Sequence, residues 1–321
     1  MYTQILIPLD GSSLSEQVLP YARFLARALA IPVQLLKVID RNEFELTTKP
    51  SQGGCFDALL SRSIASSRAY LKKIARSFQK GQVSCSVHEG NPTQVLMKKA
   101  EAEKNTLIVM ATHGGSGIRR WLLGSVANKL LQEAANDMFL IPVTDEGSTG
   151  GDAMLKRVII PLDGSGLAEK VLPRIEELAE RIGLKLVLLR VSERQLAVTK
   201  HPYTPWMSER FNRLGGELHQ YLGGKVKELK IKGLVDVEPM VKFGYAADQI
   251  IGTAEETRDS FVAMCTHGGA GMNRWVLGSV TNTVVRHSRG PVLVIRGHNP
   301  MVEQKQGSAE PTPPAWVQTK R

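Results

Sequence analysis

The chain has 321 residues, 42% of them apolar and 22% charged, as is typical of a folded, water-soluble protein with room for two domains. No apolar run reaches the roughly 18 residues of a membrane-spanning helix, and Asp10 comes too early for a signal peptide, so we expect a cytoplasmic protein without a membrane partner. The net charge of +10 is spread among interleaved acidic residues, which argues against a nucleic-acid-binding surface.

The N-terminal segment predicts a buried strand followed by a bent helix. The strand QILIPLD ends at Asp10, and the residues Asp10-Gly11-Ser12 lead into a helix. We expect that helix to begin near Ser13, because Ser13 and Glu16 have the spacing of a capping box. Pro20 falls inside the predicted helix, where its missing backbone N–H should bend it.

The rest of the first half alternates strands with helices, and a polar segment through about Gly54 is typical of a long loop. We predict strand 32–40, helix 57–79, strand 82–90, helix 92–104, strand 106–110, helix 124–135 and strand 138–143. The order is therefore βαβαβαβαβ.

The second half repeats the first. Residues 158–173 match residues 5–20 at eleven of sixteen positions, and the Gly- and Ser-rich segment 146–153 is typical of a flexible linker. The predicted elements are strand 156–162, a helix from about 167, strand 184–191, helix 206–231, strand 234–242, helix 246–257, strand 260–264, helix 278–288 and strand 291–296. We therefore divide the chain into domains 1–145 and 154–297, followed by a tail, 298–321, whose composition predicts disorder.

Strands that alternate with helices form parallel sheets covered on both faces. We therefore predict an α/β fold of two tandem, doubly wound, Rossmann-like sheets, each with five parallel strands in the order 3-2-1-4-5. In that order the winding reverses between the first and fourth strands, and ligands bind at the carboxyl ends of the strands beside that point. Those strand ends carry the sequences PLDGS and THGG in both halves, which predicts one ligand site in each.

A glycine-rich segment connects the fourth strand to the next helix in each half. ATHGGSGIRRWLLGS (111–125) and CTHGGAGMNRWVLGS (265–279) are identical at ten of fifteen positions, without a gap. The start of a helix leaves backbone N–H groups unpaired, and its dipole favours negative charge. Our working hypothesis is a phosphate-binding loop that is present twice.

Together these features resemble the universal stress protein family over both halves, roughly 1–145 and 154–297. ATP-binding members of that family carry the signature Gly, two residues, Gly, nine residues, then Gly-Ser or Gly-Thr. Nine residues separate Gly114 from Gly124-Ser125, and nine separate Gly268 from Gly278-Ser279. Such matched spacing in both halves is far more specific than an isolated glycine cluster.

The chain departs from this signature at the first glycine, which is Ala111 in one half and Cys265 in the other. Alanine adds only a methyl group, whereas a cysteine side chain is larger and could crowd a ligand. We therefore expect the first site to be the better one. Cys265 itself we interpret as a buried small hydrophobic residue, and with Cys55 and Cys85 it forms no CxxC pair that would indicate a disulfide framework or a zinc site.

The resemblance implies ATP, or a related adenine nucleotide, as the ligand, and it leaves open whether Mg²⁺ or Mn²⁺ accompanies it. It implies that an aspartate contacts ribose or adenine, that valines line the base, and that glycine and serine groups hold the phosphates. The implied nucleotide-binding residues are Pro8, Leu9, Asp10, Val38, Ala111, Gly114, Gly124, Ser125 and Val126 in the first half, and Pro161, Leu162, Asp163, Val191, Cys265, Gly268, Gly278, Ser279 and Val280 in the second.

Several of these residues also have a structural explanation. Asp10 and Asp163 precede Gly-Ser and would suit a turn, and Ser125 and Ser279 would suit the start of a helix. The histidines of the loops, His113 and His267, have no triad or metal spacing around them, so we expect them to orient the loop rather than to catalyse.

The leading hypothesis is a tandem universal stress protein that binds an adenine nucleotide and regulates an unknown protein partner in response to stress or energy state. Two alternatives are a nucleotide-independent scaffold and a slow ATP-hydrolysing enzyme, although no Walker lysine or clear general base is present. The resemblance also implies pairing through the last strands, 138–143 and 291–296. The chain would then be an intramolecular pseudo-dimer, and further homodimerisation stays open.

Overall fold

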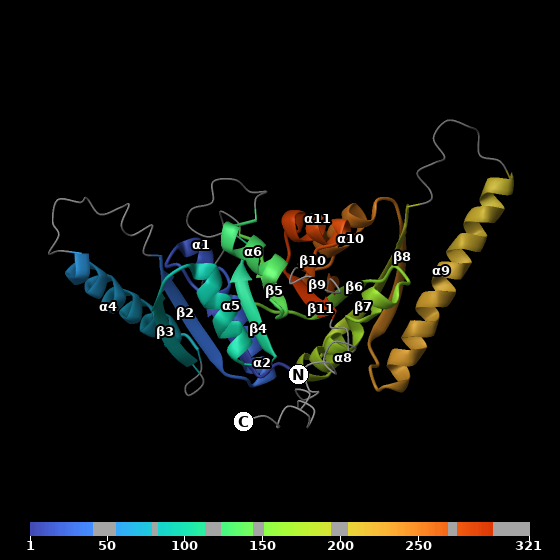
Figure 1. Ribbon diagram of the computed structural model, residues 1–321. Helices are drawn as coiled ribbons and strands as arrows, with labels where there is room; N and C mark the ends of the chain where they lie inside the picture. Colours follow the sequence, from blue (N-terminus) through green and yellow to red (C-terminus); the bar gives the residue numbers. More distant parts are fainter. Residues whose placement is uncertain are drawn as a thin grey trace, which may run out of the picture.

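The computed structural model describes residues 1–40, 56–78, 83–103, 105–112, 123–143, 151–193, 205–268 and 275–297 (Figure 1). The first half contains β1 (Gln4–Pro8), α1 (Ser13–Glu16), α2 (Leu19–Leu29), β2 (Val33–Ile39), α4 (Phe56–Ala75), β3 (Val83–Glu89), α5 (Pro92–Ala102), β4 (Thr106–Ala111), α6 (Ser125–Glu133) and β5 (Met138–Ile141). The second contains β6 (Arg157–Pro161), α7 (Gly166–Glu169), α8 (Leu172–Ile182), β7 (Lys185–Ser192), α9 (Pro205–Ile231), β8 (Val237–Phe243), α10 (Ala246–Glu256), β9 (Ser260–Gly268), β10 (Trp275–Val276), α11 (Ser279–His287) and β11 (Val292–Gly297).

The strands of both halves form one sheet in the order β3-β2-β1-β4-β5-β11-β9-β6-β7-β8, with β10 paired to β9. Within each half these strands are parallel and follow the predicted order 3-2-1-4-5, which confirms the α/β fold class. The halves meet through β5 and β11, which are antiparallel and pair Leu140 with Val292 and Phe139 with Leu293. Pairing through the last strands is therefore confirmed, and the two predicted sheets are continuous.

Helices cover both faces of the sheet because its central strands are apolar on both sides. Ile5 and Ile7 point to one face and Leu6 to the other, and all three are fully buried. We call the two layers the α4-side core and the α6-side core. The α4-side core includes helix residues Leu25, Leu71, Leu178 and Leu222 of α2, α4, α8 and α9. The α6-side core includes Leu96, Leu130, Ile250 and Val284 of α5, α6, α10 and α11.

The first helix of each half differs from the prediction. Ser12, not Ser13, caps α1, and its side chain accepts a hydrogen bond from the Ser15 backbone N–H over 3.1 Å. Gln17 and Val18 keep right-handed backbone angles but form a turn between the helices, and α2 starts at Leu19, so that Pro20 lies in a first turn instead of bending a continuous helix. A first-turn proline removes an N–H that has no helical acceptor, and Pro173 occupies the matching place in α8.

Two further segments depart from the prediction. Strand β9 does not end at residue 264 but continues to Gly268, because β11 pairs with it in parallel through His267 and β10 pairs with its last two residues in antiparallel register. The end of the expected flexible linker is held against α2: Arg23 and Arg27 both pair with Asp152, and the Ala153 N–H donates to the Pro20 carbonyl. The predicted loop 41–55 and the tail 298–321 lie outside the described residues. No helix in the described part is long and apolar enough to cross a membrane.

Candidate functional site

A tight turn follows the first strand of each half, at the edge where the predicted ligand site lies. In the first half Oδ1 of Asp10 accepts hydrogen bonds from the Ser12 N–H (2.8 Å) and the Ser12 hydroxyl (2.6 Å). Gly11 between them has a φ of +92°, a left-handed conformation that disfavours side chains. The predicted turn role of Asp10 is thus realised, and its carboxylate lies exposed at the end of β1.

The second half repeats this turn nearly atom for atom. Oδ1 of Asp163 accepts from the Ser165 N–H (2.8 Å) and hydroxyl (2.5 Å), and Gly164 has a φ of +80°. Partial burial raises the pKa of Asp163, but the Ser165 hydrogen bonds and the nearby Arg190 charge outweigh burial and leave the pKa below its ordinary value. The carboxylate is therefore ionised at neutral pH.

A cation and a tyrosine that sequence reasoning missed lie beside each turn. Lys37 of β2 lies beside Gly11 and over the ring of Tyr70 of α4, with 5.3 Å from Nζ to the ring centroid. Glu16 is close to this ring, and burial first and then Glu16 raise the pKa of the Tyr70 hydroxyl well above its ordinary value. No hydrogen bond of standard geometry reaches that hydroxyl from the described residues.

The matching group in the second half is more completely hydrogen-bonded. Arg190 of β7 donates from Nη1 to the Leu162 carbonyl over 3.0 Å and lies 5.6 Å from the ring centroid of Tyr221. The Tyr221 hydroxyl donates to Glu169 over 2.7 Å, and Lys225 pairs with the same carboxylate at 2.7 Å. The available signal was a cation that follows an apolar pair in each strand, one residue before Val38 and Val191.

The helices after the glycine-rich segments begin where the spacing predicted. Gly124 and Gly278 are the N-cap residues of α6 and α11, and among the described residues no side chain caps either helix. The Gly124 N–H donates to the Thr112 carbonyl over 2.7 Å, so this donor is already used within the chain. Ser125 and Ser279 are exposed first residues of their helices, whereas Gly114 lies outside the described part.

The predicted apolar contacts divide between the two faces. The four valines, Val38, Val126, Val191 and Val280, are half-buried and border the α6-side core. Leu9, Leu162 and Ala111 belong to the α4-side core, and Pro8 and Pro161 end strands β1 and β6. All these residues lie near the carboxyl edge of their half, but only the valines share the face that α6 and α11 cover.

The Cys265 thiol packs into the α4-side core. A Cβ placed on Gly297 would lie 3.0 Å from the Cys265 Sγ and 3.1 Å from Leu167 Cδ1, which places the thiol in this corner. Burial, with a smaller effect of Asp137, raises the pKa of Cys265 to about 11. The thiol is therefore protonated at neutral pH and lies on the opposite face of the sheet from Val191 and Val280. Cys265 is half-buried, so the interpretation of a buried small residue holds only in part.

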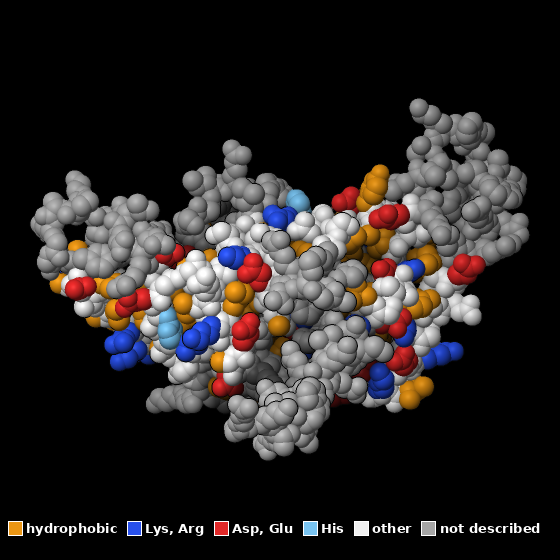
Figure 2. Space-filling view, in the orientation of Figure 1, with side chains coloured by type: hydrophobic (Ala, Val, Ile, Leu, Met, Phe, Trp, Pro, Cys, Tyr) orange, Lys and Arg blue, Asp and Glu red, His pale blue; other side chains and the backbone are white. Residues whose placement is uncertain are grey.

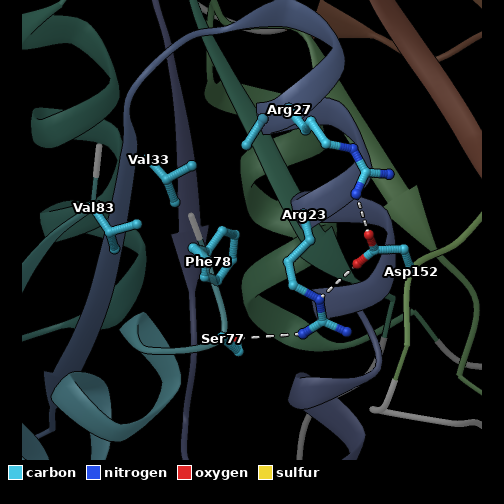
Figure 3. Close-up of a pocket in the computed structure, with 8 residues that line it drawn as sticks. Arg23, Arg27, Val33, Ser77, Phe78, Val83 and Asp152 are labelled. Atoms are coloured by element: carbon cyan, nitrogen blue, oxygen red, sulfur yellow. Dashed lines mark hydrogen bonds and ion pairs between the residues drawn. The ribbon is translucent and has the colours of Figure 1, made fainter. Parts of the chain in front are cut away.

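A separate cavity of about 60 Å³ opens at the other end of the strands (Figure 3). Val33 and Val83, which begin β2 and β3, form its apolar wall with Phe78. On its polar side Arg23 and Arg27 point at the Asp152 carboxylate. Both arginines are already paired with Asp152. We therefore interpret the cavity as a gap beside the contact between α2 and the segment that joins the halves, and not as a ligand site.

The described part of the chain contains no metal centre, and on the face seen in Figure 2 its side chains form no basic stripe. No group of three or more histidine, cysteine, aspartate or glutamate side chains could hold a metal in that part of the chain. On the face seen in Figure 2, described basic side chains alternate with acidic ones. His113, and the side chain of His267, lie outside the described residues.

Comparisons with known proteins agree with this architecture. The model of the Universal stress protein family matches residues 1–142 and 154–296. Universal stress protein MJ0531 from Methanocaldococcus jannaschii is 31% identical over 136 residues, which are 42% of this chain and 78% of that protein.

Two solved structures share the fold across nearly the whole chain. One is a universal stress protein from Archaeoglobus fulgidus, which is 20% identical with a TM-score of 0.65 and is matched over 93% of this chain and 100% of its own. The other is a functionally unknown protein from Pseudomonas aeruginosa, 14% identical with a TM-score of 0.59, matched over 95% of this chain and 96% of its own.

Proposed function

Because the chain belongs to the universal stress protein family, with two family domains in tandem, we propose that it binds ATP or a related adenine nucleotide at the carboxyl edge of each half. Binding would then shift its shape or its choice of protein partner, as a response to stress or energy state. A nucleotide does so only if it binds two conformations unequally.

One observation carries this proposal: the same three features gather at the same sheet edge twice. An ionised or exposed aspartate follows the first strand, a half-buried valine is the second-last residue of the second strand, and a helix whose glycine N-cap has no side chain follows the fourth. This combination supplies a hydroxyl acceptor, an apolar wall and backbone N–H donors. A nucleoside phosphate needs all three.

The structure suggests which groups would hold each part of the nucleotide. Asp10 and Asp163 would accept from ribose hydroxyls, and Val38 and Val191 would contact the base. The Gly124 N–H already donates to the Thr112 carbonyl. The phosphates would therefore be bound by the backbone N–H groups of the first turn of α6, beginning with that of Ser125. An accompanying Mg²⁺ or Mn²⁺ would neutralise phosphate charge, and its ligands would come mainly from the phosphates themselves.

Equilibrium dialysis with ATP, with and without Mg²⁺, tests the proposal. We expect binding at or below millimolar nucleotide, with up to two nucleotides per chain. Absence of binding at millimolar ATP would favour a nucleotide-independent scaffold of the same fold. Accumulation of ADP or AMP above the rate of a Gly114/Gly124 double variant would instead favour a slow hydrolase.

A further inference from the structure

A cation approaches the backbone of each Asp-Gly-Ser turn so closely that a side chain there would collide with it. A Cβ placed on Gly11 would lie 2.7 Å from the Lys37 Nζ, and one on Gly164 would lie 3.1 Å from the Arg190 Nη1. Lysine and arginine differ in length and shape, yet both halves bring a positive charge to this point. The shared property is therefore charge, not a particular side chain.

Each cation is held in place from the α4 side of the sheet. The rings of Tyr70 and Tyr221 lie within cation–π distance, at 5.3 Å and 5.6 Å from the two cations. Arg190 also fixes the peptide before Asp163 through its bond to the Leu162 carbonyl, while its Nε is buried without a partner among the described residues. The cations are thus fixed in position beside the turn.

The charge balance of these groups explains why a cation would be needed. In the second half burial raises the pKa of Asp163 and the Arg190 charge lowers it, while Lys225 pairs with both Glu169 and Glu228, so Arg190 is the cation that offsets the aspartate of the turn. In the first half Lys37 lies beside Gly11, the residue after Asp10, and over the ring of Tyr70, whose pKa is raised by burial and by the charges of Glu16 and Asp10. Without Arg190 or Lys37, an ATP molecule with about four negative charges would meet uncompensated carboxylates at the very residue that should receive its ribose.

We propose that Lys37 and Arg190 are specificity-determining counter-charges of the two nucleotide sites. Each offsets the aspartate of its turn, so that a carboxylate that binds ribose does not repel the polyphosphate. The sites would for this reason prefer phosphorylated nucleosides over uncharged ones. This inference rests on the proposed nucleotide binding.

The test compares ATP with uncharged adenosine by calorimetry on the full chain. Lys37→Met and Arg190→Met keep side-chain bulk but remove the charge, whereas Lys37→Arg and Arg190→Lys keep the charge. We expect the double Met variant to bind ATP about tenfold more weakly than the wild-type chain, with adenosine affinity changed less than about twofold. The charge-conserving double variant should retain most ATP affinity, and the loss in the Met variant should shrink as salt is raised.

A merely structural role predicts another pattern. If the cations only support the turn, the Met variants lose ATP and adenosine affinity equally, and salt does not change the loss; that result overturns the inference. Unchanged ATP affinity in the Met variants also overturns it while leaving nucleotide binding intact. A wild-type chain that binds neither probe would instead reject the proposed function itself, and the inference with it.

Discussion

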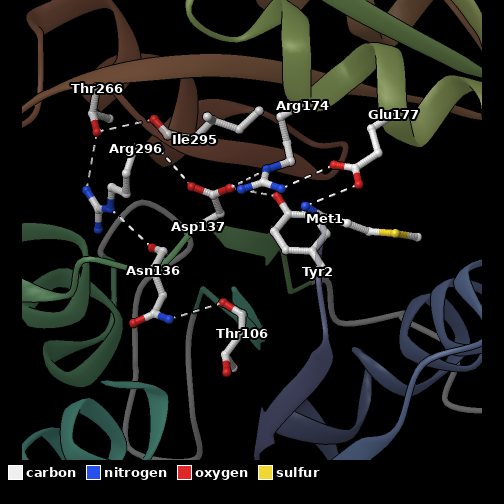
Figure 4. Close-up of polar contacts among 10 residues, drawn as sticks. All are labelled: Met1, Tyr2, Thr106, Asn136, Asp137, Arg174, Glu177, Thr266, Ile295 and Arg296. Atoms are coloured by element: carbon white, nitrogen blue, oxygen red, sulfur yellow. Dashed lines mark hydrogen bonds and ion pairs between the residues drawn. The ribbon is translucent and has the colours of Figure 1, made fainter. Parts of the chain in front are cut away.

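The backbone N–H of Arg296 donates to Oδ1 of Asp137 over 2.8 Å, a hydrogen bond that joins the last strand of the second half to the first half (Figure 4). The other Asp137 oxygen accepts from the Tyr2 hydroxyl (2.8 Å) and lies 3.3 Å from Nε of Arg174. The Arg296 guanidinium meanwhile donates to the carbonyls at the end of α6, including that of Leu131 at 2.9 Å. A buried polar network therefore accompanies the β5–β11 pairing.

Asp137→Ala should destabilise the whole chain by about 3 kcal/mol, because it leaves buried donors on both halves without an acceptor. The side chain of Asp137 is 6% exposed, whereas that of its neighbour Glu177 is 30% exposed. Glu177→Gln is the matched control and should cost less than about 1 kcal/mol. Urea denaturation of both variants measures the difference, and equal losses would show that the Asp137 network adds nothing to the interface.

The two tyrosines beside the turns should respond differently to loss of their hydroxyls. Tyr221→Phe removes a 2.7 Å hydrogen bond to a carboxylate and should cost about 1–2 kcal/mol. Tyr70→Phe removes a buried hydroxyl without a hydrogen bond from the described residues, so it should be neutral or slightly stabilising. Thermal unfolding of the pair checks this; a larger loss for Tyr70→Phe would mean that the Tyr70 hydroxyl donates a hydrogen bond to Glu16.

The Asp152 contact should make a small, pH-dependent contribution. Burial raises the pKa of Asp152, but hydrogen bonds from Arg23 and Arg27 outweigh it and leave the pKa below its ordinary value of 3.8. A lowered folded-state pKa stabilises the fold above about pH 4, and this stability is lost as the pH falls through the folded value. Because the side chain is 34% exposed, Asp152→Asn should cost under about 1 kcal/mol at pH 7. The difference from wild type should vanish near pH 2 in an acid-unfolding titration.

Cys265 should resist alkylation at neutral pH, since its pKa of about 11 keeps the thiol protonated. Cys85 is exposed, although burial of part of its side chain raises its pKa too. Mass mapping after brief iodoacetamide treatment at about pH 8 should find Cys85 labelled well before Cys265. The folded state also holds the Cys265 proton more tightly than the unfolded chain, so stability should fall as the pH rises from about 9 to 11, and less so in Cys265→Ala.

Much of the fold follows from local sequence signals. The apolar periods located nearly every strand and helix, and the duplicated Asp-Gly-Ser segment indicated two matching turns, which the left-handed Gly11 and Gly164 confirm. The choice of Ser12 over Ser13 as the cap was not predictable in this way, because adjacent serines have equal capping ability and only backbone geometry separates them.

The missed features depend on contacts between distant segments. Strand β9 extends to Gly268 because β11 pairs with residues through His267 and β10 with His267 and Gly268, and no local propensity marks those pairings. Lys37 and Arg190 each contact a tyrosine ring on a helix that comes more than thirty residues later in the chain. The sequence shows that each strand contains a cation, but it does not show that this cation lies between the Asp-Gly-Ser turn and a tyrosine ring.

Calorimetric titration of ATP into the wild-type chain and a Gly124→Val/Gly278→Val double variant tests the central claim most directly. Both glycines have a φ of −56°, which valine can adopt, and a Cβ on Gly278 would meet no atom within 4 Å, so the variant should fold. Gly252→Val in α10, where a Cβ also meets nothing within 4 Å, is the control away from the site. We predict binding by the wild-type and control chains and its loss in the double variant; equal ATP affinity in all three would contradict the account.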